Sequence, residues 1–240
     1  MKIWSTMICG AALYAASGCS TTDLNNAFVA GAGSVLEAAT LDKAQVQAQS
    51  KMAVRQLDRQ ARIAPAGTRY AQRLARLTQG LDQYQGLALN FAVYIDDSIN
   101  AFATPDGSVR VHTGLMDRMS DDQVLAVIGH EIGHVVQEHS YQQMRKAMLA
   151  RGVRQAIAST ESGALAAGMV GELSEVALNA RFSQQDELAS DRFAVAFLRE
   201  RGVNPDAMRQ SLMVLLADGD TGGGFLSSHP SSQARIDALR

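Results

Sequence analysis

The stretch that decides the fold is His130-Glu131-Ile132-Gly133-His134. Residues four apart on an α-helix lie about 40° apart around the axis and roughly 6 Å apart along it, so both imidazoles can bind one metal ion from the same face. Glu131 projects one residue round from His130 and can reach a metal-bound water without being a ligand. This division of roles suits zinc-dependent hydrolysis of a peptide bond. We therefore predict that His130 and His134 bind Zn²⁺ and that Glu131 is the catalytic base.

The flanking sequence favours a helix around this pentapeptide. Ser120-Asp121-Asp122-Gln123 has the form of a capping box, and its acidic residues suit the positive end of the helix dipole. The apolar run that follows covers nearly all sides of the helix, which indicates burial in the core. Gly129 and Gly133 each cost about 1 kcal/mol relative to Ala in a helix interior. We expect the close approach of another backbone, from a neighbouring helix or a substrate, to compensate.

Length and composition favour one domain with a sizeable core. The chain has 240 residues, of which 47% are hydrophobic, and it contains only 4 Pro. Its net charge of −2 gives no electrostatic basis for binding nucleic acid. No run of 18 apolar residues follows the N-terminal region, so we expect no internal transmembrane span.

The N-terminal residues have the pattern of an export signal. A short positive start precedes a mostly apolar stretch at residues 3–16, which has the length of a signal peptide. Ala16-Ser17-Gly18 then precedes Cys19, and small residues directly before a Cys resemble a bacterial lipobox, in which the Cys is lipidated. An ordinary cleaved secretory signal is the alternative. Ser20 after the Cys resembles the pattern of lipoproteins of the outer membrane.

These features predict how the chain is divided. We expect a lipoprotein signal peptide at residues 1–18, a tether at 19–40 and a single zinc metallopeptidase domain at 41–240. Cys9 would leave with the signal and Cys19 would carry lipid, so the mature chain would hold no disulfide. The expected location is the cell envelope, as an outer-membrane lipoprotein that faces the periplasm and contacts the membrane through its N-terminal lipid.

The predicted fold class is α+β and mainly helical, a zincin-like domain with a small antiparallel sheet next to the metal-binding helix. Helical and strand-like patterns alternate along the chain. We expect helices at 42–62, 67–85, 181–201 and 205–217, and strands at 87–95, 100–104 and 109–113. Pro105-Asp106-Gly107 predicts a tight turn between the last two strands. We place 109–113 at the sheet edge, where it could pair with an extended peptide. Residues 152–179, rich in Ala, Gly and Ser, are either a flexible cover over the site or a plain helical hairpin.

A catalytic zinc usually has three protein ligands, so a third is needed. Glu187 and Asp191 lie four apart on a predicted helix and share a face, so one could bind the metal while the other orients a ligand imidazole. The pair alone could equally be a solvated acidic face. A continuing helix would place His139 about 140° round from His134, so we interpret His139 as structural. We interpret His112 as a surface residue rather than a substrate contact.

His130-Glu131-x-x-His134 followed by Glu187-x-x-x-Asp191 resembles the gluzincin metallopeptidase family that includes HtpX and the CAAX prenyl proteases. Further segments between about residue 90 and residue 240 match that family in the same order, namely Asn100-Ala101-Phe102-Ala103, Thr113-Gly114-Leu115 and Ser228-His229-Pro230 with Arg235. Within the family the chain most resembles the small periplasm-facing lipoproteins of the YggG (LoiP) type. These carry the peptidase domain without the transmembrane helices of HtpX.

The resemblance implies a ligand set and a function. It makes Glu187 the third ligand of one Zn²⁺ per chain and Asp191 the partner of a ligand histidine. It makes His229 a candidate for contact with the substrate or its oxyanion, with a structural or helix-capping role as the alternative. The implied enzyme is a zinc endopeptidase in which Glu131 activates a zinc-bound water.

The resemblance also implies a role in protein quality control, on misfolded or misassembled envelope proteins. The expected partners are protein or peptide substrates and candidate outer-membrane assembly factors, with no nucleic acid. A latent peptidase, or a non-enzymatic binding or chaperone module with a masked zinc site, is the alternative. A non-peptide hydrolase is a weaker third reading.

Overall fold

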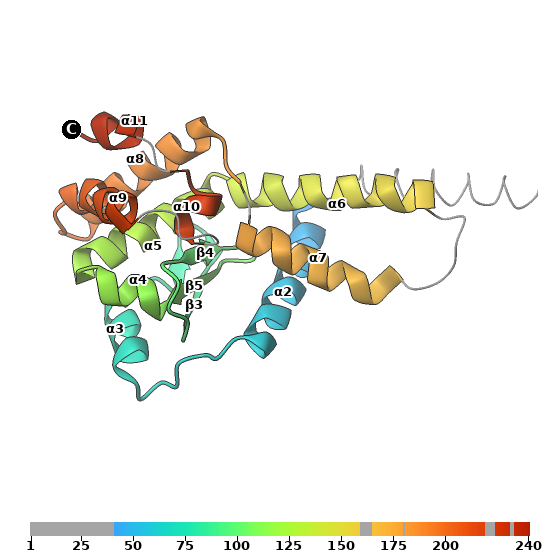
Figure 1. The fold of residues 1–240 in the computed structure, drawn as a ribbon, viewed down its shortest axis with the longest axis horizontal. Helices are drawn as coiled ribbons and strands as arrows, with labels where there is room; N and C mark the ends of the chain where they lie inside the picture. Colours follow the sequence, from blue (N-terminus) through green and yellow to red (C-terminus); the bar gives the residue numbers. More distant parts are fainter. Residues whose placement is uncertain (1–40, 159–164, 180, 219–223, 231–232) are drawn as a thin grey trace, which may run out of the picture.

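The computed structural model describes residues 41–158, 165–179, 181–218, 224–230 and 233–240 (Figure 1). Within these ranges the fold is α+β and mainly helical, as predicted. The expected signal peptide at 1–18 and the tether at 19–40, including Cys19, lie outside the described residues. None of the helices in the described ranges is long and apolar enough to cross a membrane.

The helices are numbered in chain order. They are α2 (Lys43–Gln60), α3 (Arg69–Leu77), α4 (Thr113–Arg118), α5 (Asp121–Val136), α6 (His139–Ala158), α7 (Leu165–Asn179), α8 (Gln184–Glu200), α9 (Asp206–Asp218), α10 (Phe225–Ser228) and α11 (Gln233–Ala238). The strands are β1 (Gln83–Tyr84), β2 (Leu87–Ala88), β3 (Asn90–Tyr94), β4 (Ala101–Ala103) and β5 (Ser108–His112). The prediction of a helix at 67–85 is wrong for the second half of that range. It ends at Leu77, Gly80 adopts a φ of +78°, and β1 and β2 form a short antiparallel hairpin.

The main sheet has the order β3-β5-β4. β4 and β5 are antiparallel around the predicted turn, where Gly107 has a φ of +85°. β3 and β5 are parallel, so the prediction of an antiparallel sheet is wrong for this pair. The strand predicted at 109–113 is also not an edge strand, because β5 lies between its two neighbours. A Cβ on Gly107 would lie 2.1 Å from the Ala88 carbonyl oxygen, so only Gly lets the hairpin dock this closely.

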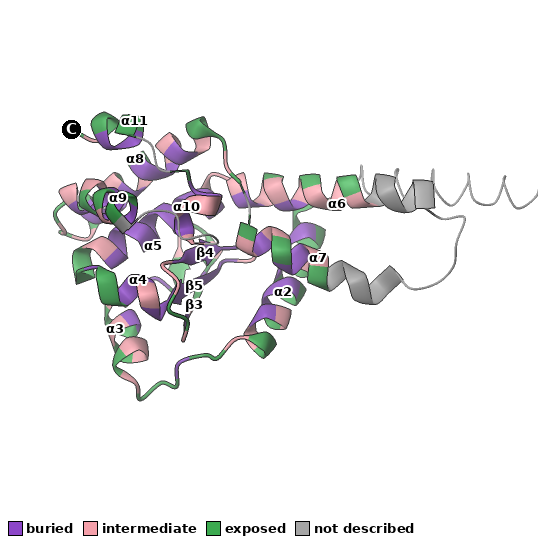
Figure 2. Cartoon of the chain, viewed as in Figure 1, coloured by how far each residue is buried: buried purple, intermediate pink, exposed green. Residues whose placement is uncertain are grey.

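The two faces of the sheet pack against different helices. Val109 and Val111 of β5 join the core that contains α5, whereas Arg110 and His112 point to the opposite face, towards α2 and α7. Figure 2 shows the resulting arrangement, with most of α5 and the strands β4 and β5 buried between the outer helices. Arg110 is 4% exposed and forms a two-pronged ion pair with Asp58 of α2, at 2.9 and 3.0 Å. This pair fixes α2 to the sheet.

The metal-binding helix α5 begins as predicted, with reciprocal hydrogen bonds between Ser120 and Gln123. Its glycines face α8. A Cβ on Gly129 would meet the ring of Phe197, and one on Gly133 would meet Phe193. The prediction that another backbone approaches these glycines is therefore wrong. Aromatic side chains of a neighbouring helix fill the space that the glycines leave.

The segment expected at 152–179 divides into the end of α6 and the whole of α7. The described part is a pair of helices, with α7 packed against both α2 and α6 (Figure 1). Leu173 and Ala177 of α7 are buried in the cluster that contains Phe102 of β4. The described part agrees with the helical hairpin, whereas residues 159–164 lie outside the described residues, and α7 also covers the β4 side of the sheet.

Candidate metal centre

Four buried side chains from three parts of the chain meet in the core. His130 and His134 come from α5, Glu187 comes from the first turn of α8, and His229 follows α10. Each offers one ligand atom, and these atoms all lie within 4.8 Å of one another. Their side chains are 0 to 2% exposed. The structure thus brings the three predicted ligands together and adds His229 to them.

The spacing of the donor atoms matches what a tetrahedral zinc requires. Zinc bonds of about 2.0–2.1 Å place tetrahedral ligand atoms roughly 3.3 Å apart. The Nε2 atoms of His130 and His134 are 3.0 Å apart, and His130 Nε2 lies 3.3 Å from His229 Nδ1. Glu187 Oε1 lies 3.0 Å from His229 Nδ1 and 3.5 Å from His134 Nε2. These residues therefore fit a zinc ion in both donor type and spacing.

A second layer of charged groups holds the ligands. Asp191 Oδ1 lies 2.9 Å from His130 Nδ1, so Asp191 lies where the resemblance placed it, beside a ligand histidine. Arg235 is fully buried and reaches Asp191 through Nε at 2.8 Å and Nη2 at 2.6 Å. Its Nη1 lies 2.5 Å from Glu187 Oε2. Arg235 entered the sequence argument only as part of a motif, and its role as the clamp on both carboxylates comes from the structure.

The electrostatics keep these carboxylates ionised. Burial alone would raise the pKa of Glu187, but His229 and His134 outweigh it, and the pKa lies well below its ordinary value. Burial likewise opposes the hydrogen bonds from Arg235 and His130 at Asp191, and its pKa is also lowered. An ionised carboxylate is the form that binds a metal ion.

Glu131 is buried beside the cluster but is not one of its four donor residues. Its Oε1 lies 3.3 Å from His229 Nε2, and a backbone hydrogen bond joins its carboxylate to Ala103 of β4. Burial raises the pKa of Glu131 more than the neighbouring histidines lower it. A carboxyl group with a raised pKa is suited to accepting a proton and returning it.

A family comparison decides the class of this site. The family model for Peptidase family M48 matches residues 67–240, which include every residue of the cluster. The chain belongs to peptidase family M48. It is similar to the metalloprotease LoiP of Escherichia coli K12, with 36% identity over all of this chain and 96% of that protein. It is also similar to the metalloprotease YcaL of the same strain, with 32% identity over 93% of this chain and 91% of YcaL.

Another relative covers part of the chain. The beta-barrel assembly-enhancing protease of E. coli K12 is 32% identical over 63% of this chain and 34% of its own length. These matches confirm the predicted family and its LoiP-like character. Together with the donor set, they make this M48 member a zinc metalloendopeptidase.

His229 has two structural roles in the M48 site. Its backbone N–H donates to Phe225 and ends α10, while its imidazole enters the donor cluster. The ring stacks on Phe225, with centroids 4.3 Å apart, and on Phe182 at 5.1 Å. Phe182 also stacks on His134 at 3.8 Å. The pattern of apolar residues gave no reason to place either Phe at the metal centre.

The positions of two further histidines, His139 and His112, differ from the predicted ones. His139 lies against the cluster, with its Nδ1 3.2 Å from His134 Nδ1, so its predicted position on a different face is wrong. His112 is 6% exposed and its Nδ1 lies 2.7 Å from Ser98 Oγ, so it is buried rather than on the surface. It lies on the α2 side of the sheet and has no place in the donor cluster.

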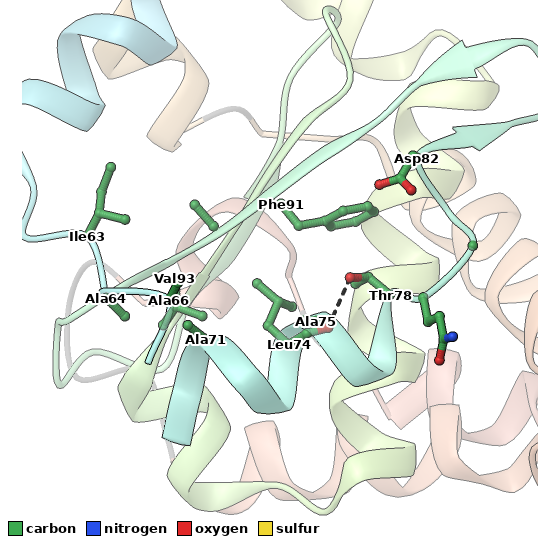
Figure 3. Close-up of a pocket in the computed structure, with 13 residues that line it drawn as sticks. Ile63, Ala64, Ala66, Ala71, Leu74, Ala75, Thr78, Asp82, Phe91 and Val93 are labelled. Atoms are coloured by element: carbon green, nitrogen blue, oxygen red, sulfur yellow. Dashed lines mark hydrogen bonds between the residues drawn. The ribbon is translucent and has the colours of Figure 1, made fainter. Parts of the chain in front are cut away.

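A separate pocket of about 450 Å³ lies between α3 and β3 (Figure 3). Its walls are mostly small apolar side chains, including Ala64, Ala71 and Ala92, with Phe91 at one end. The side-chain hydroxyl of Thr78 donates to the Leu74 carbonyl oxygen within its wall. None of the predicted site residues lines it, so the metal centre and this pocket are distinct features.

Proposed function

We propose that this chain is a membrane-tethered zinc endopeptidase that hydrolyses peptide bonds in misfolded or misassembled envelope proteins. The observation that carries the peptidase chemistry is the donor cluster with the buried Glu131 carboxylate beside it. The sheet next to the site, and the relatives named as proteases, support a polypeptide substrate.

The proposed roles follow from the positions of the side chains. His130, His134 and Glu187 would hold the zinc, and Asp191 with Arg235 fixes the orientation of His130 and Glu187. When bound, zinc polarises the scissile carbonyl and acidifies the attacking water. Glu131 accepts the proton from that water and passes it to the leaving amine. Because Glu131 binds no metal in this scheme, its loss should stop turnover without emptying the site.

The test is Glu131→Gln, which keeps the shape of the side chain and removes the base. We expect cleavage of unfolded casein to fall by at least roughly 10²-fold, while the purified variant retains one zinc per chain. Cleavage by the wild-type protein should stop when a chelator is added. A Glu131→Gln variant that cleaves casein as fast as wild type would show that the assigned mechanism is wrong.

A second candidate function is a latent form of the same peptidase, and the position of His229 favours it. Catalytic zinc sites keep one coordination position open for water or substrate, whereas His229 Nδ1 lies where a fourth ligand would be. The cluster and Glu131 are at most 2% exposed, so a peptide reaches them only after covering residues move. We infer that the structure represents a closed state and that His229 leaves the cluster when substrate enters.

The His229→Ala variant distinguishes the proposed roles of His229. If His229 holds the enzyme closed, the variant should cleave casein several-fold faster than wild type and should retain zinc through three ligands. If His229 instead stabilises the oxyanion, cleavage should fall while zinc stays bound. Zinc-loaded wild type and His229→Ala that are both inactive would favour the non-enzymatic binding module.

The proposed location and domain division rest on the N-terminal sequence. Ala16-Ser17-Gly18 before Cys19 supports lipidation, a signal peptide at 1–18, a tether at 19–40 and a peptidase domain at 41–240. A relative named for enhancing beta-barrel assembly supports substrates or partners in outer-membrane assembly. Incorporation of labelled palmitate and recovery with outer membranes should both be lost in Cys19→Ala. Retention of the label in that variant would exclude Cys19 as the lipidated residue.

A further inference from the structure

The junction between α5 and α6 is a sharp turn made by a residue that is not glycine. α5 ends at Val136, and Glu138 adopts a φ of +63° before α6 begins at His139. A residue with a side chain in this left-handed region costs of the order of 1–3 kcal/mol, unless the surrounding structure favours it. The consequence of the turn is that His139 points back to His134 instead of continuing round the helix.

The turn brings His139 into direct contact with one zinc ligand. His139 Nδ1 lies 3.2 Å from His134 Nδ1, the nitrogen on the side of the ring away from the donor cluster. On its other side, His139 Nε2 lies 3.4 Å from Asp186 Oδ1. Ser190 Oγ also lies 3.4 Å from His139 Nδ1, and Phe182 stacks on the face of His134.

We propose that His139, oriented by Asp186, is a positioning residue for the zinc ligand His134. His134 Nδ1–H donates to His139 Nδ1, and the carboxylate of Asp186 lies beside His139 Nε2 and favours a proton on that nitrogen. These contacts favour the tautomer of His134 whose Nε2 lone pair would face the metal. The inference rests on the proposed zinc site and adds a residue that the sequence motif does not contain.

The arrangement parallels the one at the other histidine ligand. His130 meets the carboxylate of Asp191 directly, at 2.9 Å, whereas His134 reaches Asp186 through the intervening imidazole of His139. Both carboxylates belong to α8, on either side of the ligand Glu187 in sequence. One helix therefore provides the third ligand and orients both of the others. Hydrogen-bond partners of this kind typically contribute 10–100-fold to metal affinity.

The experiment compares zinc affinity among variants, measured by competition with a fluorescent chelator. His139→Leu removes the acceptor, and we expect zinc to bind about 10–100-fold more weakly. His139→Asn places an amide oxygen near the position of Nδ1, and we expect it to restore most of the affinity. Asp186→Asn should weaken binding less than His139→Leu, because it removes only the negative charge beside His139 Nε2 and keeps an oxygen that can accept a hydrogen bond.

Glu138→Gly is the matched control, because it keeps the turn and leaves His139 in place. Its zinc affinity should equal that of wild type. Thermal unfolding of the chelator-treated variants reports whether each one folds. A folded His139→Leu variant that binds zinc as tightly as wild type would overturn the proposal, as would His139→Asn binding as weakly as His139→Leu. If wild type itself binds no zinc, the proposed function fails, and this outcome is distinct from either of those.

Discussion

The contact between Gly129 of α5 and Phe197 of α8 sets the spacing of the two helices that carry the metal-binding residues. A Cβ added at Gly129 would lie 2.6 Å from Phe197 Cδ1 and 3.2 Å from its Cε1. The Phe197 ring is 1% exposed, and the ring of Tyr84 packs edge-on against it with centroids 5.7 Å apart. Because the ring is enclosed, Gly129→Ala should force the helices apart rather than simply rotate one side chain.

The expected magnitude follows from two opposing effects. Ala gains about 1 kcal/mol over Gly in a helix interior. Overpacking a tight core costs about 1–3 kcal/mol, and a contact that must open from 2.6 Å to an ordinary 3.4 Å belongs at the upper end. Gly129→Ala should therefore lose a net 1–2 kcal/mol or so of stability.

Gly133→Ala is a control on the same face of the same helix. Its Cβ would meet Phe193 at 3.1 Å, and that ring is half-buried and can shift by a few tenths of an ångström. The gain in helix propensity and the smaller packing cost should nearly cancel. The pair of variants thus separates the packing effect from the helix propensity that both share.

Thermal unfolding of the zinc-loaded proteins tests this. A change of 1 kcal/mol shifts Tm by about 2–4 °C in a chain of this size, so Gly129→Ala should melt about 2–8 °C below wild type. Gly133→Ala should stay within about 2 °C of wild type. Phe197→Leu should restore part of the loss in the Gly129→Ala background. A Gly129→Ala variant that melts at or above wild type would show that helix propensity dominates and that the contact does not limit the approach of α8.

Two further predictions concern the third ligand and the α2 anchor. Glu187→Ala should purify with far less than one zinc per chain, measured by metal analysis; full occupancy would remove Glu187 from the ligand set. Burial alone would raise the pKa of Asp58, but the hydrogen bonds from Arg110 and Tyr94 outweigh it and the pKa is lowered. The stability from this interaction is therefore present above the unfolded pKa of about 3.9 and is lost as the pH falls through the lower folded pKa. Asp58→Ala should cost about 2 kcal/mol at pH 7, the size typical of hydrogen bonds to a charged group. Its unfolding free energy, measured by urea titration, should approach that of wild type as the pH falls below about 4. A difference that does not change with pH would exclude the charged pair as its source.

The part of the site that lies on α5 could be predicted from the sequence, because it depends only on the spacing of residues within one helix. The capping box at Ser120 and Gln123 and the four-residue interval between His130 and His134 are properties of one helix, and both occur in the structure. Glu187 could be assigned only by resemblance, since its distance from His130 depends on how α8 packs against α5. Aromatic residues of α8 fill the space beside the glycines of α5, a pairing that no pattern within either helix specifies.

The features that the sequence did not predict are contacts between distant segments and one unexpected backbone conformation. The alternation of apolar and polar residues identifies β3 and β5 as strands. It carries no information on whether the two strands run parallel or on which strands are neighbours in the sheet. Arg235 lies 44 residues from Asp191 in sequence, and nothing local to either predicts the pairing. A helix that continued past His134 would place His139 on a different face, whereas Glu138 adopts a left-handed backbone conformation, which Gly and Asn adopt more readily than Glu.

The charges buried around the site explain why a divalent cation suits it. Within the described residues, the carboxylates of Glu131, Glu187 and Asp191 surround the donor cluster, and the guanidinium of Arg235 is the permanently charged cation among them. When all three carboxylates are ionised and the histidines are neutral, two negative charges remain uncompensated in a region that excludes water. An uncompensated buried charge is strongly destabilising, and a doubly charged metal ion balances this set. Burial lowers the pKa of His229, but the carboxylates of Glu131 and Glu187 outweigh this effect and the pKa is raised, as expected beside excess negative charge.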